Sequence, residues 1–233
     1  MKFVSPVYSD AWGKIAGLVY ARNRFGMYTR ALVTPVNPQS SEQQQVRNAL
    51  AAMNARWTET LTAAQRAAWE AYALAVPKVS HGQSLTLTGQ NWFIACNTPR
   101  VQCDAAISPT TLPIIDDAPT LFNQAQSFPV AITRNAATQN WDCAFDNTQD
   151  WASEAGAAII IRQSRGTNAS RNFFKGPYRL MNRVAGAGTP PASPKVFAAV
   201  FPIVSGLRYF FESRLVRADG RISSPFQTSA LIA

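Results

Sequence analysis

Few residues of this chain have the types and spacing that catalysis requires. Its single histidine, His81, adjoins Gly82 just after a helical segment, and no serine, cysteine and aspartate arrangement surrounds it. A histidine-dependent triad would need this one residue, and we interpret it as a loop histidine. None of the thirteen acids forms an evident pair for glycoside hydrolysis. We therefore predict that the protein is not an enzyme.

The possible metal ligands are also poorly spaced. The chain has three cysteines, an odd number without a CxxC spacing: Cys96, Cys103 and Cys143. They fit no zinc finger and no disulfide framework, so we expect buried, reduced thiols. Three aspartates recur every four residues, whereas an EF-hand alternates its acids every second residue: Asp142, Asp146 and Asp150. The glycines of the segment AGAGTPP are not followed by the Lys-Ser or Lys-Thr pair of a phosphate-binding loop. We expect no metal and no cofactor.

The strongest chemical signal is basic. No acid lies between Ala155 and Phe211, and the 162–183 segment interleaves Phe173, Phe174 and Tyr178 with six bases, Arg162, Arg165, Arg171, Lys175, Arg179 and Arg183. Bases bind phosphates and aromatic rings stack on nucleobases. The alternative is a hairpin whose rings fill a core while its arginines face water or an acidic neighbour. The absence of an RNP, KH or helix-turn-helix signature favours this alternative.

Three bases near the N-terminus allow the same two interpretations: Arg22, Arg24 and Arg30. The net charge of +9 is concentrated at the two ends, with +4 in residues 1–36, −1 in 37–119 and +6 in 120–233. A basic balance favours nucleic acid or acidic protein surfaces as partners. The nine bases of the two segments are our candidate partner-binding residues.

The composition indicates a folded protein with much surface in contact with partners. Hydrophobic residues make up 47% of the 233 residues, but charged residues only 15%, below the roughly 25% of typical soluble domains. Fewer charges then need to be desolvated when subunits associate. The N-terminus lacks the apolar core of a signal peptide, and no stretch reaches the roughly eighteen apolar residues of a membrane span. We expect synthesis in the cytoplasm and no membrane partner.

The N-terminal half predicts a small β-hairpin followed by helices. In residues 1–36, KIAGLVYA and MYTRALV favour strands, and NRFG between them favours a turn. A two-stranded hairpin is marginal alone and needs a further surface. In residues 37–103 we expect a helical hairpin, whose second helix begins at Thr62 with Gln65 in a capping box. A third, short helix beginning near Thr88 would turn three residues inward: Trp92, Phe93 and Cys96.

The C-terminal half predicts a sheet protein. Residues 104–119 contain three prolines and suggest an extended, surface-lying linker. Residues 120–233 hold short β-rich runs separated by turn residues, which is typical of an antiparallel sandwich. In the run RYFFESRLVR, alternation places Tyr209, Phe211, Ser213 and Leu215 on one face, with Phe210 and Glu212 on the other. The predicted class is α+β: a β-hairpin and a small helical region followed by an immunoglobulin-like sandwich.

The first half also resembles virion-associated proteins of tailed bacteriophages and prophages. The pattern is carried by a Gly-Lys, an Arg-Asn-Arg turn with glycine, an Asn-Pro, and later Gln, Arg and Trp positions: Gly13, Lys14, Arg22, Asn23, Arg24, Gly26, Asn37, Pro38, Gln45, Arg47, Trp57, Leu61, Thr62, Gln65, Arg66 and Trp69. The segment LTGQNWFIACN extends it. The resemblance implies a virion component and brings no catalytic residues. The second half resembles an immunoglobulin or fibronectin type III sandwich, a fold often displayed on virion surfaces.

These features predict a structural component of a tailed-phage virion. The expected form is a capsid-associated (cementing or decoration) protein, held by contacts with other virion proteins and with copies of itself. One alternative is a tail component, and another is a nucleic-acid-binding protein that uses the 162–183 segment. A third is a carbohydrate-binding module that displays Trp141 and Trp151.

Overall fold

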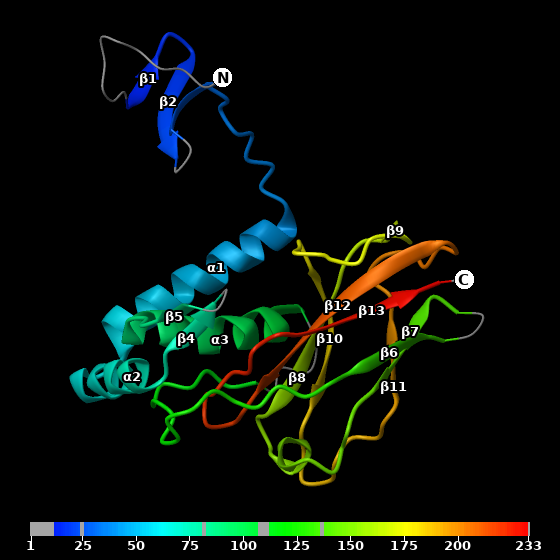
Figure 1. The fold of residues 1–233 in the computed structure, drawn as a ribbon. Coiled ribbons are helices and arrows are strands. Elements are labelled where there is room, and N and C mark those ends of the chain that lie inside the picture. The colour runs from blue at the N-terminus through cyan, green and yellow to red at the C-terminus, as the bar shows by residue number, and fades with distance from the viewer. Residues whose placement is uncertain (1–11, 24–25, 81–82, 107–111, 136–137, 233) are drawn as a thin grey trace. The chain divides into compact units, whose positions relative to one another are not determined.

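The computed structural model describes residues 12–23, 26–80, 83–106, 112–135 and 138–232 of the chain (Figure 1). Both His81 and Arg24 lie outside these residues. The chain forms two compact units, residues 1–40 and 41–233. We call the described part of the first unit, residues 12–40, the arm, and that of the second the body. Helices and antiparallel sheets occur together, so the fold class is α+β, as predicted.

The arm is a three-stranded antiparallel sheet in the order β1-β2-β3. The predicted hairpin is confirmed as β2 (Leu18–Asn23) paired with β3 (Gly26–Ala31). A further strand, β1 (Gly13–Ile15), was not predicted and pairs with β2. The tight connection between β1 and β2 uses left-handed backbone at Ala16 and Gly17, with φ of 47° and 79°. Residues 32–40 continue without regular structure into the body.

Three helices form one layer of the body. The second begins as predicted: the Thr62 hydroxyl accepts from the Gln65 amide at 3.2 Å, and the Gln65 side chain accepts from the Thr62 amide at 2.9 Å. This capping box fixes the first turn. A π-helical turn, Arg56–Thr60, follows the first helix, and a short hairpin of β4 (Lys78–Ser80) and β5 (Gln83–Leu85) follows the second. The helices are α1 (Ser41–Ala55), α2 (Ala63–Ala75) and α3 (Gly89–Ala106).

The prediction that the third helix is short was wrong. Helix α3 has 18 residues and continues through Pro99, which cannot donate a backbone hydrogen bond. Residues on both sides of the proline are fully buried, among them Cys96, Arg100 and Cys103. This packing offsets the local cost of the proline. The inward orientation of Trp92, Phe93 and Cys96 is confirmed, because all three are buried in one cluster with α1 and α2 residues.

Two antiparallel sheets form the rest of the body. The larger has the order β10-β8-β12-β13, with β9 also paired to β12, and the smaller has the order β11-β7-β6. The strands of the larger sheet are β8 (Ala158–Gln163), β9 (Thr167–Asn168), β10 (Arg179–Ala185), β12 (Leu207–Val216) and β13 (Phe226–Leu231). Those of the smaller sheet are β6 (Ala131–Arg134), β7 (Asn140–Ala144) and β11 (Lys195–Ala198).

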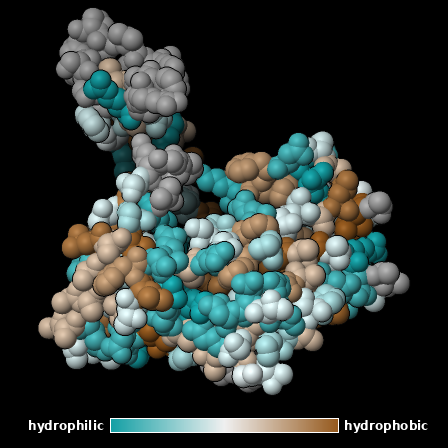
Figure 2. All heavy atoms as spheres, turned by 60° about the horizontal axis from the view of Figure 1, so that its bottom comes forward, coloured by the Kyte–Doolittle hydropathy of each residue, from teal (hydrophilic) through white to brown (hydrophobic). Residues whose placement is uncertain are grey.

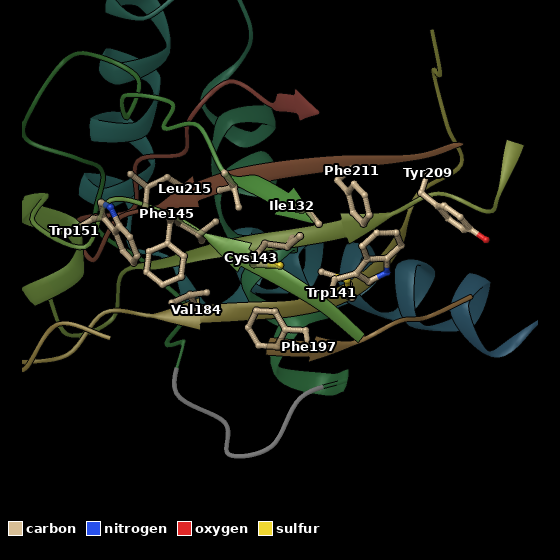
Figure 3. Packing of buried hydrophobic residues seen from close by; sticks show 14 of the residues in the cluster. Ile132, Trp141, Cys143, Phe145, Trp151, Val184, Phe197, Tyr209, Phe211 and Leu215 are labelled. Carbon is tan, nitrogen blue, oxygen red and sulfur yellow. The ribbon is translucent and has the colours of Figure 1, made fainter. Parts of the chain in front are cut away.

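The strands β8 and β12 of the larger sheet are buried on both faces. Tyr209, Phe211 and Leu215 of β12 belong to a cluster shared with the smaller sheet, as their alternation predicted (Figure 3). Ile160 of β8 and Val216 of β12 belong instead to the helical cluster. The helices therefore cover one face of this sheet, and the smaller sheet shares a core with the other. That the two sheets form an immunoglobulin-like sandwich remains a prediction.

The segment predicted as a linker is extended but packs against the helices. Leu112 is 4% exposed and belongs to the helical cluster. Asp116 forms an ion pair with Arg56 at 2.6 Å, and its carbonyl accepts from the indole of Trp69 at 2.8 Å. The predicted linker, 104–119, is therefore corrected in two places: residues 104–106 belong to α3, and residues 112–119 pack against the helices and do not simply lie on the surface. No helix within the described residues has the length and hydropathy to cross a membrane.

Candidate interaction surfaces

The arm has one apolar face, which follows from its strand register. Leu18 pairs with both Ile15 and Ala31, Tyr20 pairs with Thr29, and Arg22 pairs with Met27. Directly paired residues of antiparallel strands project to the same side of a sheet. One face therefore gathers Ile15, Leu18, Tyr20, Met27 and Ala31, which we call the apolar face, and the same side also carries Thr29 and Arg22. The opposite face carries Lys14, Val19, Ala21, Tyr28 and Arg30.

No residue of the arm with a described side chain is buried. The exposed fractions are 66% for Ile15 and 42% for Leu18 on the apolar face, and 74% for Trp12 just before it. A small sheet gains independent stability only by covering a hydrophobic face. Contiguous exposed apolar surface is typical of interaction sites. The arm as described therefore has a hydrophobic face without a core beneath it.

All charged side chains of the arm are positive. Residues 11–41 contain four bases and no acid. Lys14 and Arg30 are exposed and pair with the same residue, Val19, so they lie together on the face opposite the apolar one. Arg22 is exposed at the end of the apolar face. A partner surface with carboxylates around an apolar centre is complementary to this arrangement.

Three of the six bases in the predicted 162–183 segment form ion pairs within the body. Arg162 pairs with Glu212 at 3.3 Å, Arg179 pairs with Glu42 at 2.6 Å, and Arg183 pairs with Asp104. The hydrogen bond from Arg179 lowers the pKa of the Glu42 carboxyl group. Burial lowers the pKa of the Arg162 guanidinium. These three arginines join strands β8 and β10 to α1, α3 and β12, so the structure does not present them as one binding surface.

The other half of the segment is exposed. Arg165, Arg171 and Lys175 lie in the connection between β8 and β10. The Arg165 guanidinium lies over the Phe201 ring, with its carbon 5.6 Å from the ring centroid. The Arg171 guanidinium lies 5.1 Å from the centroid of the Phe174 ring. These three bases form the second candidate surface.

The tryptophans proposed for carbohydrate binding are core residues. Trp141 and Trp151 are each 0% exposed (Figure 3). Trp141 makes edge contacts with Tyr209 and Phe211 at centroid distances of 5.4 and 4.9 Å. Trp151 packs on Phe145 at 5.7 Å. This alternative was wrong, because neither ring is accessible to a sugar.

The predicted buried thiols are confirmed, and each is free. Burial raises the pKa to about 12 for Cys96 and Cys143 and to about 11 for Cys103. A thiol with such a pKa is a poor nucleophile at neutral pH.

The three spaced aspartates have separate partners. The Asp142 carboxylate accepts from Asn135 at 2.8 Å, that of Asp146 from the Thr148 hydroxyl at 2.7 Å, and Asp150 pairs with Arg217 at 2.9 Å. Within the described residues, no group of three or more histidines, cysteines or acids is placed to hold a metal ion.

The hydrophobic residues of the arm were the main feature that the sequence predictions missed. Those predictions singled out the arginines of the arm, whereas the register shows five apolar residues on the same side of the sheet as Arg22. The alternation in residues 18–22 indicated that Leu18 and Tyr20 share a face. Strand β1, which adds Ile15 to this face, was not expected. On the view in Figure 2, hydrophobic residues of the body form several separate groups among hydrophilic ones.

Comparisons with protein-family models, curated proteins and solved structures returned no match.

Proposed function

We propose that this protein is a structural subunit of a multi-protein assembly and that its arm covers an apolar surface of a neighbouring subunit. The observation that carries the proposal is the exposed apolar face of the arm, centred on Ile15 and Leu18. Burying a large aliphatic side chain contributes roughly 1.5–3 kcal/mol. Docking would therefore supply the hydrophobic cover that the arm lacks.

The charges of the arm indicate what kind of surface it meets. An arm that docked on a second arm would bring two groups of four bases together. The rest of the chain also has a positive net charge, because the total is +9 and residues 1–36 account for +4. Like charges at an interface oppose association. We therefore propose that the surface under the arm belongs to a different, acidic subunit.

The assembly that we propose is the particle of a tailed phage, with this chain as a capsid-associated, cementing or decoration protein. The residue pattern of the N-terminal half supports this choice. So does the low charged fraction of 15%, which suits a protein surrounded by other subunits. In a particle with many identical sites, several modest contacts give a firm attachment through avidity.

The experiment is to follow the chain through a density gradient of its native source after nuclease treatment. Quantitative mass spectrometry gives its copy number relative to the most abundant shell protein. The proposal predicts a fixed ratio to the shell protein across the particle band, before and after the nuclease. A ratio that instead follows a tail protein would place the chain in the tail. Absence from particles would contradict the proposal.

A further inference from the structure

A second surface of the protein lies in the connection between β8 and β10, residues 164–178. It carries three exposed bases, Arg165, Arg171 and Lys175, and none of them has a carboxylate partner among the described residues. The surrounding sequence from Ala155 to Phe211 contains no acid. These three cations are therefore not neutralised by ion pairs within the described residues.

Two of the three bases are held in place by aromatic rings. The Arg171 guanidinium stacks on Phe174, and its Nε donates to the carbonyl of Phe173 at 2.7 Å. The Phe174 ring is fixed in turn by Phe210, which stacks on it at 5.6 Å with an interplanar angle of 14°. Arg165 is held over Phe201 in the same way. Ordering these side chains before a ligand arrives lowers the entropic cost of binding.

One aromatic ring of this surface faces solvent. Phe173 is 67% exposed, whereas the adjacent Phe174 is 8% exposed and packs on the sheet. In the sequence, Phe173 lies between Arg171 and Lys175. An exposed ring next to cations provides a face on which a nucleobase can stack while the cations bind its phosphates.

We propose that this connection binds single-stranded nucleic acid, with Arg165, Arg171 and Lys175 on phosphates and Phe173 stacked on a base. An acidic protein segment would use the same three cations but has no base to stack on Phe173. A duplex keeps its bases stacked inside the helix, and this connection, which contains the short strand β9 but no helix, has no helix to enter the major groove. Single-stranded nucleic acid therefore accounts for both the cations and the exposed ring.

The test measures binding of the full chain to a fluorescent oligothymidylate by anisotropy over a range of salt concentrations. The triple variant R165A/R171A/K175A should bind at least about ten-fold more weakly at low salt. Each lost phosphate contact lowers the salt slope by about 0.7 for single strands, so the slope should fall by about 2. The control K78A/R134A/K195A removes three other exposed bases and likewise lowers the net charge from +9 to +6. It should change neither quantity appreciably.

The stacking contact is tested separately. The variant F173A should weaken binding about ten-fold and leave the salt slope unchanged, because it removes a stack and no charge. The control F122A removes another exposed ring, which is 58% exposed and stacks on Tyr72 near the helices. It should bind as the unaltered chain does.

Any of three results would overturn the proposal. The first is that the unaltered chain does not bind the oligonucleotide, and the second is that K78A/R134A/K195A weakens binding as much as R165A/R171A/K175A. The third is that polyglutamate of similar length binds as tightly and with the same dependence on Phe173, which would assign the surface to an acidic protein. None of these results bears on the arm, so the two proposals stand or fall independently.

Discussion

Replacing Gly186 with alanine should unfold much of the body under conditions in which the unaltered protein is stable. A Cβ at this position would lie 2.2 Å from the carbonyl oxygen of Trp151 and 2.6 Å from that of Glu154. Both are backbone atoms, so no side-chain rotation relieves the overlap. The backbone N–H of Gly186 also donates to the Ala157 carbonyl at 2.9 Å, which holds the close approach in place. The carbonyls of Trp151 and Glu154 belong to the turn that buries the Trp151 side chain in the core.

Overpacking a well-filled site typically costs 1–3 kcal/mol and more where backbone must move, so we expect G186A to lose about 3 kcal/mol or more. Urea denaturation followed by tryptophan fluorescence measures this loss. The control is G188A, two residues along, where an added Cβ has no atom within 4 Å. It should change the free energy of unfolding by less than about 0.5 kcal/mol. Equal midpoints for the two variants would contradict the described packing of this turn.

The second large effect is expected at Arg100, which is 0% exposed. Its guanidinium donates to the carbonyls of Pro113 at 3.2 Å, Gly156 at 3.3 Å, and Arg217. One side chain of α3 thus connects the 112–119 segment with two connections of the large sheet. Burial lowers the pKa of this guanidinium. The Arg217 carbonyl also accepts from the Gly220 amide, so it would keep one hydrogen-bond donor if Arg100 were removed.

The variant R100A would leave a cavity and would remove the only donors to the Pro113 and Gly156 carbonyls within the described residues. An unsatisfied buried polar group costs about 1–3 kcal/mol, and a truncated core side chain adds a cavity cost, so we expect a loss of about 4 kcal/mol. The control R100M restores much of the volume without the donors and should lose roughly half as much. If R100M is as stable as the unaltered chain in urea denaturation, the hydrogen bonds of Arg100 do not stabilise the body.

Local sequence signals predicted the local features of the fold. The Thr62 and Gln65 pair marked the start of α2, and alternation in 207–216 assigned the two faces of β12. The length of α3 was not predictable in this way. Its continuation through Pro99 depends on packing against the 112–119 segment and the large sheet, which are distant in sequence. Tertiary burial there outweighs the local preference of one residue.

The candidate surfaces were predictable only in part. The sequence identified nine bases but could not show that Arg183 pairs with Asp104, 79 residues away, or that Arg179 pairs with Glu42. It also could not separate Phe173, which is exposed, from Phe174, which is buried. Two adjacent phenylalanines look alike in the sequence. Which of them is buried depends on how the chain runs over the sheet. The apolar face of the arm likewise depended on the unpredicted pairing of β1 with β2.

The most direct test of the central claim changes the apolar face of the arm and measures incorporation into particles. The variant I15D/L18D places two carboxylates on this face, and the control V33D/V36D places two on exposed valines beyond β3. Losing two buried aliphatic contacts and burying charge costs more than about 3 kcal/mol, which corresponds to over 100-fold in affinity.

Tagged variants expressed beside the unaltered chain compete for the same sites, and mass spectrometry of purified particles gives their ratio. We expect I15D/L18D to be nearly lost from particles and V33D/V36D to be retained. Both isolated variants should unfold in urea at the same midpoint as the unaltered chain. Retention of I15D/L18D at the level of V33D/V36D would contradict the account. A lowered midpoint for isolated I15D/L18D would contradict it as well, because the apolar face would then be covered by the protein's own body.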